Sequence, residues 1–263
     1  MTKHKLLLGL LIYGSFAWAQ QESTAVEPLI TDRPDATEAP NLVQRGFLQI
    51  ETGTFYEEFE NGPVTQKAWT LNTMLLRYGL LDNLELRLGW DFQEIRTEIA
   101  GTELDNIQSG LQPLLVGAKI GIADRNGFWP QIGLLGHVYL PLSAGQDFRP
   151  ETTGVDFRFS FDHSLSERSG IAYNIGMQWR DDSPEAAYVY TLAYGYGLTE
   201  RLGLYAEIYG DLPEDSSPNH SWDAGLTYLV NPDLQLDATI GSGITTDQEL
   251  LLSAGFSYRI RKW

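Results

Sequence analysis

The sequence predicts an all-β protein, a transmembrane antiparallel up-and-down β-barrel of about 12 strands. Long segments alternate between apolar and polar residues with period two, which is the pattern of a strand with two unlike faces. These segments are joined in turn by tight connections and by mostly longer loops. After the first 19 residues, no stretch holds the roughly twenty apolar residues that a membrane-spanning helix needs. The chain therefore crosses a membrane, if it does so, with strands.

The alternation is clearest in residues 84–92, LELRLGWDF. Leucine and aromatic side chains occupy the even positions there, while Glu85, Arg87 and Asp91 occupy the odd ones. Average hydropathy is low in such a strand because only alternate residues face lipid. The pattern predicts strands over residues 46–59, 66–80, 84–98, 110–123, 128–141, 152–163, 170–180, 185–198, 202–211, 219–229, 234–242 and 250–261.

The connections between these strands fall into two sets. One set is short and rich in turn-forming residues, with a longer member at 164–169; it comprises 81–83, 124–127, 199–201 and 230–233. The other set is mostly longer and often acidic, with one short member at 181–184; it comprises 60–65, 99–109, 142–151, 212–218 and 243–249. Bacterial barrels have short periplasmic turns and longer outer loops. We expect both termini on the periplasmic side, with the short turns.

A soluble β-sandwich or a lipocalin-like barrel is the alternative fold, with the apolar face as its core. The apolar face carries many large aromatic side chains for a compact interior, and the polar face carries many glycines, as a crowded lumen would need. The strands are also long for a soluble sheet, and long enough to cross a bilayer when tilted. These three features favour the membrane barrel.

The first 19 residues, MTKHKLLLGLLIYGSFAWA, have a basic start, a short apolar stretch and small residues at Ala17 and Ala19. This is the pattern of a secretory signal peptide, and the apolar stretch is too short for a membrane anchor. We therefore expect a signal peptide at 1–19, a periplasmic N-terminal segment at 20–45 and an outer-membrane barrel at 46–263. The protein would then reside in a bacterial outer membrane.

Composition excludes several classes of function. A net charge of −17 repels nucleic acid, and the absence of cysteine excludes disulfides and thiolate-bound metals. After residue 19 the histidines are His137, His163 and His220, and none has a nucleophile-elbow serine or a paired metal-ligand spacing around it. The faint resemblance of His220 and its acidic neighbours to the site of a barrel protease does not amount to a motif. We expect no enzyme activity, no cofactor and no bound metal.

Charged residues on the inward phase are the candidates for lining the lumen. Isolated charges in a confined space must pair or stay hydrated. They could form salt-bridge ladders that fill a narrow barrel, or line a hydrated path that selects permeants by charge. The candidate pore-lining residues are Arg77, Glu85, Arg87, Asp91, Lys119, His137, Asp156, Arg158, Asp162, Arg180, Glu207, Asp223, Asp237 and Arg259.

Residues 31–40, TDRPDATEAP, resemble the opening motif of a family of bacterial outer-membrane proteins described as putative transporters or as similar to a component of the meta-cleavage pathway of phenol degradation. The resemblance continues weakly through 75–80, 84–87 and 116–119 and covers most of the chain. It implies uptake of small molecules, aromatic compounds among them.

The same N-terminal segment is a candidate plug or gate. Its prolines keep the backbone extended, and its charges could pair with inward residues of the barrel. The alternative is a tether that packs under the rim and gates nothing. The candidate gate residues are Thr31, Asp32, Arg33, Pro34, Asp35 and Glu38.

Taken together, the sequence predicts a narrow or gated path for passive uptake of small molecules. The alternative is a non-conducting structural or adhesion barrel with a salt-bridged lumen. The expected partners are outer-membrane lipid, lipopolysaccharide and the barrel assembly machinery, for which a terminal aromatic such as Trp263 is a typical signal; here the charged pair before Trp263 breaks the apolar phase.

Overall fold

The computed structural model describes residues 27–180, 182 and 184–261. The expected signal peptide and Trp263 lie outside the described residues. The wall consists of β1 (Leu48–Asn61), β2 (Val64–Leu81), β3 (Leu84–Ile99), β6 (Leu114–Ala123), β7 (Gln131–Leu140), β8 (Gly154–Ser164), β9 (Ser169–Trp179), β10 (Ala186–Gly197), β11 (Leu202–Pro213), β12 (Asn219–Asn231), β13 (Leu234–Gly243) and β14 (Gln248–Ile260).

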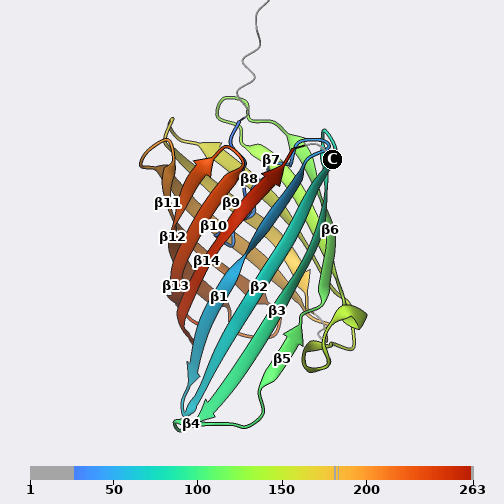
Figure 1. Ribbon diagram of the computed structural model, residues 1–263, viewed down its shortest axis with the longest axis vertical. Coiled ribbons are helices and arrows are strands. Elements are labelled where there is room, and N and C mark those ends of the chain that lie inside the picture. Colours follow the sequence, from blue (N-terminus) through green and yellow to red (C-terminus); the bar gives the residue numbers. More distant parts are fainter. Residues whose placement is uncertain (1–26, 181, 183, 262–263) are drawn as a thin grey trace, which may run out of the picture.

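These strands form one closed antiparallel barrel (Figure 1). Each strand pairs with the next, and the ring closes where β1 pairs with β14 from Leu48↔Ile260 onward. Two short strands, β4 (Thr102–Glu103) and β5 (Gln108–Leu111), extend the edge of β3 outside the ring. Two 3₁₀ turns, η1 (Pro141–Ser143) and η2 (Gln146–Phe148), lie in the loop after β7. The predicted fold class, with 12 strands in the wall, is confirmed.

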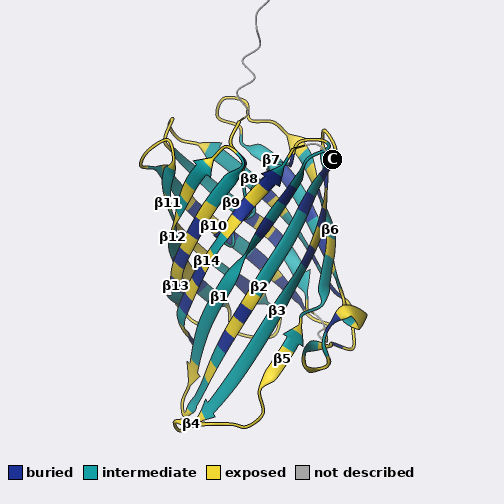
Figure 2. Cartoon of the chain, viewed as in Figure 1, coloured by how far each residue is buried: buried dark blue, intermediate teal, exposed yellow. Residues whose placement is uncertain are grey.

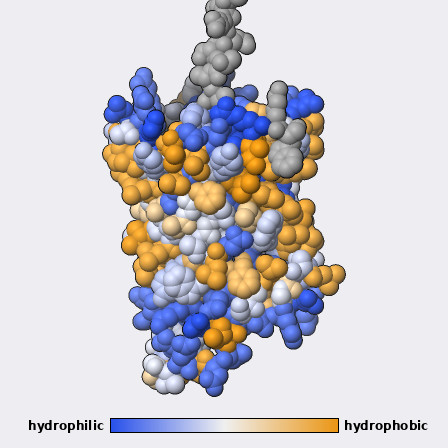
Figure 3. Space-filling model, viewed as in Figure 1, coloured by the Kyte–Doolittle hydropathy of each residue, from blue (hydrophilic) through white to orange (hydrophobic). Residues whose placement is uncertain are grey.

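The two faces of many strands differ as the alternation predicts (Figure 2). On β10, Tyr188 and Leu192 are exposed on the outer surface, whereas Val189 and Thr191 are buried. The outer surface carries an apolar band with hydrophilic residues at both ends (Figure 3). Such a band suits hydrocarbon between two polar interfaces. Within the described part of the chain, no helix has the length and apolar character needed to span a bilayer.

The two ends of the barrel also differ. The C-terminus lies at the end that carries the short turns (Figure 1). The chain enters at the same end, where the Leu29 amide donates a 2.8 Å hydrogen bond to the Pro232 carbonyl in the turn between β12 and β13. We call this the inner end and the opposite one the outer end.

Two predicted boundaries are wrong. The connection predicted at 60–65 is a tight turn, because β1 ends at Asn61 and β2 already begins at Val64. Gly62 in this turn adopts a φ of +60°. The strand predicted at 110–123 begins only at Leu114, since Pro113 has no amide to donate to a ladder. Residues 108–111 pair instead with the extended outer part of β3.

Candidate functional site

The chain before β1 runs inside the barrel. Residues 30–43 contact strands around the circumference through side chains of β2, β3, β6, β9, β10, β11 and β13. It leaves the lumen across β2, where the Gly46 amide bonds to the Gly79 carbonyl at 2.7 Å. A Cβ at Gly79 would lie 2.2 Å from the Gln44 carbonyl oxygen, so only glycine permits this crossing. We call residues 30–43 the luminal segment.

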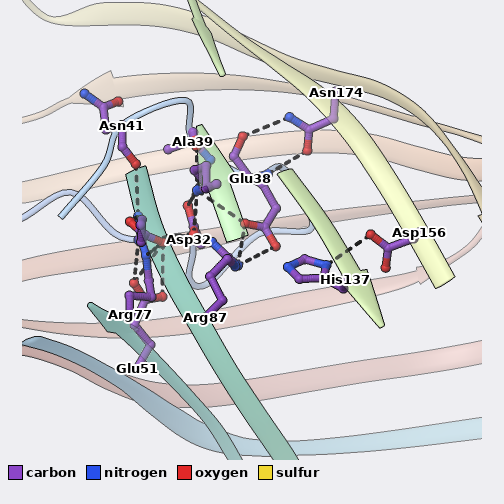
Figure 4. Close-up of polar contacts among 12 residues, drawn as sticks. Asp32, Glu38, Ala39, Asn41, Glu51, Arg77, Arg87, His137, Asp156 and Asn174 are labelled. Carbon is purple, nitrogen blue, oxygen red and sulfur yellow. Dashed lines mark hydrogen bonds and ion pairs between the residues drawn. The ribbon is translucent and has the colours of Figure 1, made fainter. Parts of the chain in front are cut away.

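Asp32 anchors the luminal segment on the β2–β3–β6 side (Figure 4). Its carboxylate lies 3.1 Å from Arg77, 2.6 Å from Arg87 and 2.8 Å from Lys119, and all these side chains are buried. Burial alone would raise the pKa of Asp32, but the three cations hold it well below the usual value. Asp32 therefore stays ionised, and the ion pairs compensate its removal from water.

Further acidic groups complete this cluster. Glu85 receives two hydrogen bonds from Arg77, of 2.8 and 2.9 Å, and Glu51 one of 2.8 Å. Glu38 of the luminal segment lies 2.8 Å from Arg87. Three cations thus face four carboxylates in a closely paired network. We call Asp32, Glu38, Glu51, Arg77, Glu85, Arg87 and Lys119 the anchor cluster.

Arg33 reaches the wall at β13 and β14, next to β1 and β2. Its guanidinium donates to Asp237 of β13 at 2.9 Å and to Ser253 of β14 at 3.1 Å. The paired glycines Gly53 and Gly255 make room for it, because a Cβ on either would lie within 2.5 Å of its Nη2 atom. The cation also lies 5.4 Å from the centre of the Phe55 ring.

The next residues bind β10 and β11. The Ala36 amide donates to Glu207 at 2.5 Å. The Thr37 hydroxyl lies 2.7 Å from the same carboxylate and 2.8 Å from the Thr191 hydroxyl. Asp35, half-buried beside Glu207 and Asp223, has its pKa raised well above the usual value by its removal from bulk water and by the charge of Glu207.

The other predicted residues are placed individually. His137 lies 3.0 Å from Asp156, which also accepts a 2.7 Å bond from Tyr139.

Near the inner end, Asp162 pairs with Arg125, and Arg259 donates to Asp233 and to the Glu27 carbonyl. Thr31 accepts a bond from Gln235, and Pro34 is buried. The half-buried Asp91 and Arg158 line cavities. Arg180 is exposed just beyond β9, 3.4 Å from Asp211.

Two cavities open on the outer side of the luminal segment. The larger, about 650 Å³, is lined by apolar and polar groups that include Phe55, Leu75, Asp91 and Tyr139. We call it the first outer cavity. The second, about 500 Å³, is lined mainly from β8 to β12 and reaches Ala36.

A third cavity of about 390 Å³ lies toward the inner end. It is lined by Asp35, Ala193, Gly195, Tyr205 and residues of the turn between β8 and β9. We call it the inner cavity. The barrel is therefore hollow above and below the luminal segment on this side.

Several residues of the site were not among those predicted. Glu51 of the anchor cluster shares the inward phase of β1, so the alternation could have identified it. Asn174 stands on the inward phase of β9. Its side-chain amide accepts a hydrogen bond from the Glu38 backbone N–H and donates one to the Glu38 carbonyl. Thr191 also stands on the inward phase of β10, but a threonine is ordinary in any strand and does not by itself indicate a site.

The geometry defines a class: a transmembrane β-barrel whose lumen is crossed by its own N-terminal segment. The family model described as "Putative MetA-pathway of phenol degradation" matches residues 31–260, and the chain belongs to that family. The match begins at Thr31, the first residue of the TDRPDATEAP motif.

Solved structures share the fold at low sequence identity. An outer-membrane channel from Pseudomonas putida F1 aligns with a TM-score of 0.62 and 13% identity over 88% of this chain and 100% of that one. The translocator domain of the autotransporter NalP from Neisseria meningitidis gives 0.51 and 10%, covering 83% and 90%. The NanC porin gives 0.50 and 9%, covering 81% and 100%. No curated protein matches the sequence.

Proposed function

We propose that the protein is an outer-membrane channel for passive uptake of small molecules, aromatic compounds among them, and that the luminal segment gates it. One observation carries the proposal: the luminal segment separates cavities that open toward opposite ends of the barrel. A barrel that served only as a scaffold would need neither the cavities nor a separate segment between them. The segment is also joined to the wall by polar contacts, which can break and reform.

The chemistry of the first outer cavity supports an aromatic permeant. Phe55 and Tyr139 provide aromatic surface, and Asp91 and Gln93 provide groups that accept hydrogen bonds. Ligand sites commonly combine apolar walls with a few polar groups that orient the ligand. A small phenolic compound suits this lining, in agreement with the description of the family.

A second candidate function rests on the anchor cluster. Its seven charged side chains fill the β2–β3–β6 side of the lumen, as in a barrel stiffened by salt bridges. A non-conducting structural barrel would use all of the lumen in this way. The cavities on the β8–β12 side favour the channel.

Conductance in planar bilayers tests the channel. The refolded mature protein would be compared with a variant lacking residues 20–40, and liposome swelling would be measured with phenol-like solutes, small aromatic acids and sugars. Larger conductance after deletion, with faster swelling in the phenol-like series, is the expected result. Heat-dependent gel mobility would show that both barrels are folded.

Because the deletion could disturb assembly, Asp237→Asn provides a second variant that weakens only the Arg33 contact. Silence of all folded variants in both assays would remove the channel and leave the structural barrel.

A further inference from the structure

The luminal segment divides the barrel unevenly. On the β2–β3–β6 side the anchor cluster holds it with buried ion pairs. On the β8–β12 side the second outer cavity reaches Ala36, while the inner cavity reaches Asp35. Two consecutive residues therefore line cavities that open toward opposite ends of the barrel.

The wall shows the same division at the same level. On β10, Thr191 lines the second outer cavity and Ala193, the next inward residue, lines the inner cavity. On β11, Tyr209 lines the outer and Tyr205 the inner cavity, and Glu207 stands between them. Glu207 is the residue that binds the Ala36 amide and the Thr37 hydroxyl. The partition is thus one peptide thick and is closed by contacts to Glu207 and to the Thr191 hydroxyl.

We propose, on the basis of the proposed channel, that permeants cross at the Asp35–Ala36 peptide, which opens by leaving Glu207 while Asp32 stays anchored. Opening there breaks a few hydrogen bonds to Glu207 and Thr191. Release of Asp32 would separate a buried carboxylate from three cations, which is far more costly. The gate is therefore a local movement of residues 35–37, and the rest of the luminal segment is its fixed frame.

The inner side of this gate has room for a moving chain or a passing molecule. A Cβ added at Gly195 would meet no atom within 4 Å, whereas one at Gly133 would lie 3.0 Å from Pro40. Ala172, Ala193 and Gly195 keep the side chains short where the inner cavity meets Asp35. Small residues on these strands leave the space that the displaced peptide requires.

The gate also has a charge. Asp35, Glu207 and Asp223 lie together, and Asp223 Oδ1 is buried without a hydrogen-bond partner among the described residues. Arg33, the nearby cation of the luminal segment, is paired with Asp237. Carboxylates around a constriction disfavour anions. Neutral small molecules should therefore cross faster than the corresponding carboxylate anions.

Cysteine labelling tests the position of the gate, because the chain has no native cysteine. Full-length Ala36→Cys, Asp35→Cys and Ala39→Cys variants would be treated in intact cells with a small membrane-impermeant maleimide. Ala36→Cys should react from outside, and Asp35→Cys should react much faster once the reagent is admitted to the periplasm. Ala39→Cys, a matched change in the same segment, borders neither of these two cavities and should react slowly under both conditions.

Planar bilayers complete the test. Modification of the Ala36→Cys thiol by a charged methanethiosulfonate should block most of the conductance, and modification of Ala39→Cys should leave it near the wild-type value. A conducting wild type with equal or no effect at the two positions would overturn this gate while leaving the channel intact. A wild type that never conducts would overturn the proposed function, and the gate with it.

Discussion

Arg33 and Asp237 are 204 positions apart in the chain, and their side chains form an ion pair of 2.9 Å inside the barrel. Both are largely or fully buried, with side-chain exposures of 10% and 0%. The pair joins the luminal segment to β13, which is separated from β2 of the anchor cluster by β1 and β14. Its energetic role can be separated from that of the cluster by substitution.

Asp237→Asn should leave the Arg33 guanidinium buried without its ionised partner. Breaking one member of a buried pair typically costs about 3–5 kcal/mol. We expect the free energy of unfolding in lipid vesicles to fall by an amount near the lower end of this range, because Ser253 and Thr73 still accept hydrogen bonds from Arg33. Urea titration would measure it.

The control for that substitution is the double variant with Arg33→Gln. Since the double variant leaves no unpaired charge, it should be less destabilised than the sum of the two single changes. Additive effects would show that the two side chains do not interact.

Gly79→Ala should displace the exit of the luminal segment over β2. The new Cβ would lie 2.2 and 2.3 Å from the backbone oxygens of Gln44 and Val43, and backbone cannot move aside as a side chain can. The expected loss of stability is about 1–3 kcal/mol, as for overpacking elsewhere. Protease cleavage before Phe47 should become faster, and cleavage unchanged from wild type would contradict the prediction.

Gly195→Phe should narrow the inner cavity without straining the wall, because nothing lies within 4 Å of the position of its Cβ. Conductance should fall to a small fraction of the wild-type value, while the free energy of unfolding changes by less than about 0.5 kcal/mol. Gly195→Ala is the matched control and should conduct almost normally. A normal conductance for the Phe variant would place the path elsewhere.

The docked state of residues 35–37 should weaken as the pH rises. Asp35 faces Glu207 of β11, Asp223 of β12, the Tyr205 ring and Asp32 of its own segment, and burial and the Glu207 charge raise its pKa well above 3.8. A group whose pKa is raised on docking binds its proton more tightly in the docked state. Its contribution is therefore complete below pH 3.8 and is lost as the pH climbs through the raised value.

The conductance of the wild type should accordingly rise as the pH increases from 3.8 through the raised pKa of Asp35. Asp35→Asn should flatten the rise, since an amide does not titrate. The stabilisation that Asp32 contributes has the opposite pH dependence, because the pKa of Asp32 is lowered and this contribution disappears only at low pH. An Asp35→Asn profile with the same slope as the wild type would assign the titration to other groups.

Much of the barrel was predictable because successive residues of a strand point to opposite faces, so odd and even positions in the sequence face opposite sides of the wall. Leu84 to Phe92 alternates in the chain, and Glu85 and Arg87 are buried inside as that parity requires. The loop predicted at 60–65 is wrong because alternation alone does not show where a strand ends. Only the pairing of Asn61 with Val64 shows that β1 and β2 extend to a two-residue turn.

By itself, the sequence determined the strand order, the inward and outward faces and the family, since these depend on local alternation and on the TDRPDATEAP motif. Only the tertiary structure decided which charges meet. Asp32 binds Arg77, Arg87 and Lys119 from three different strands, and Ala36 binds Glu207 from a fourth. No spacing in the chain encodes those partners, because closure of the barrel brings all the inward charges within reach, and the path of the luminal segment selects among them.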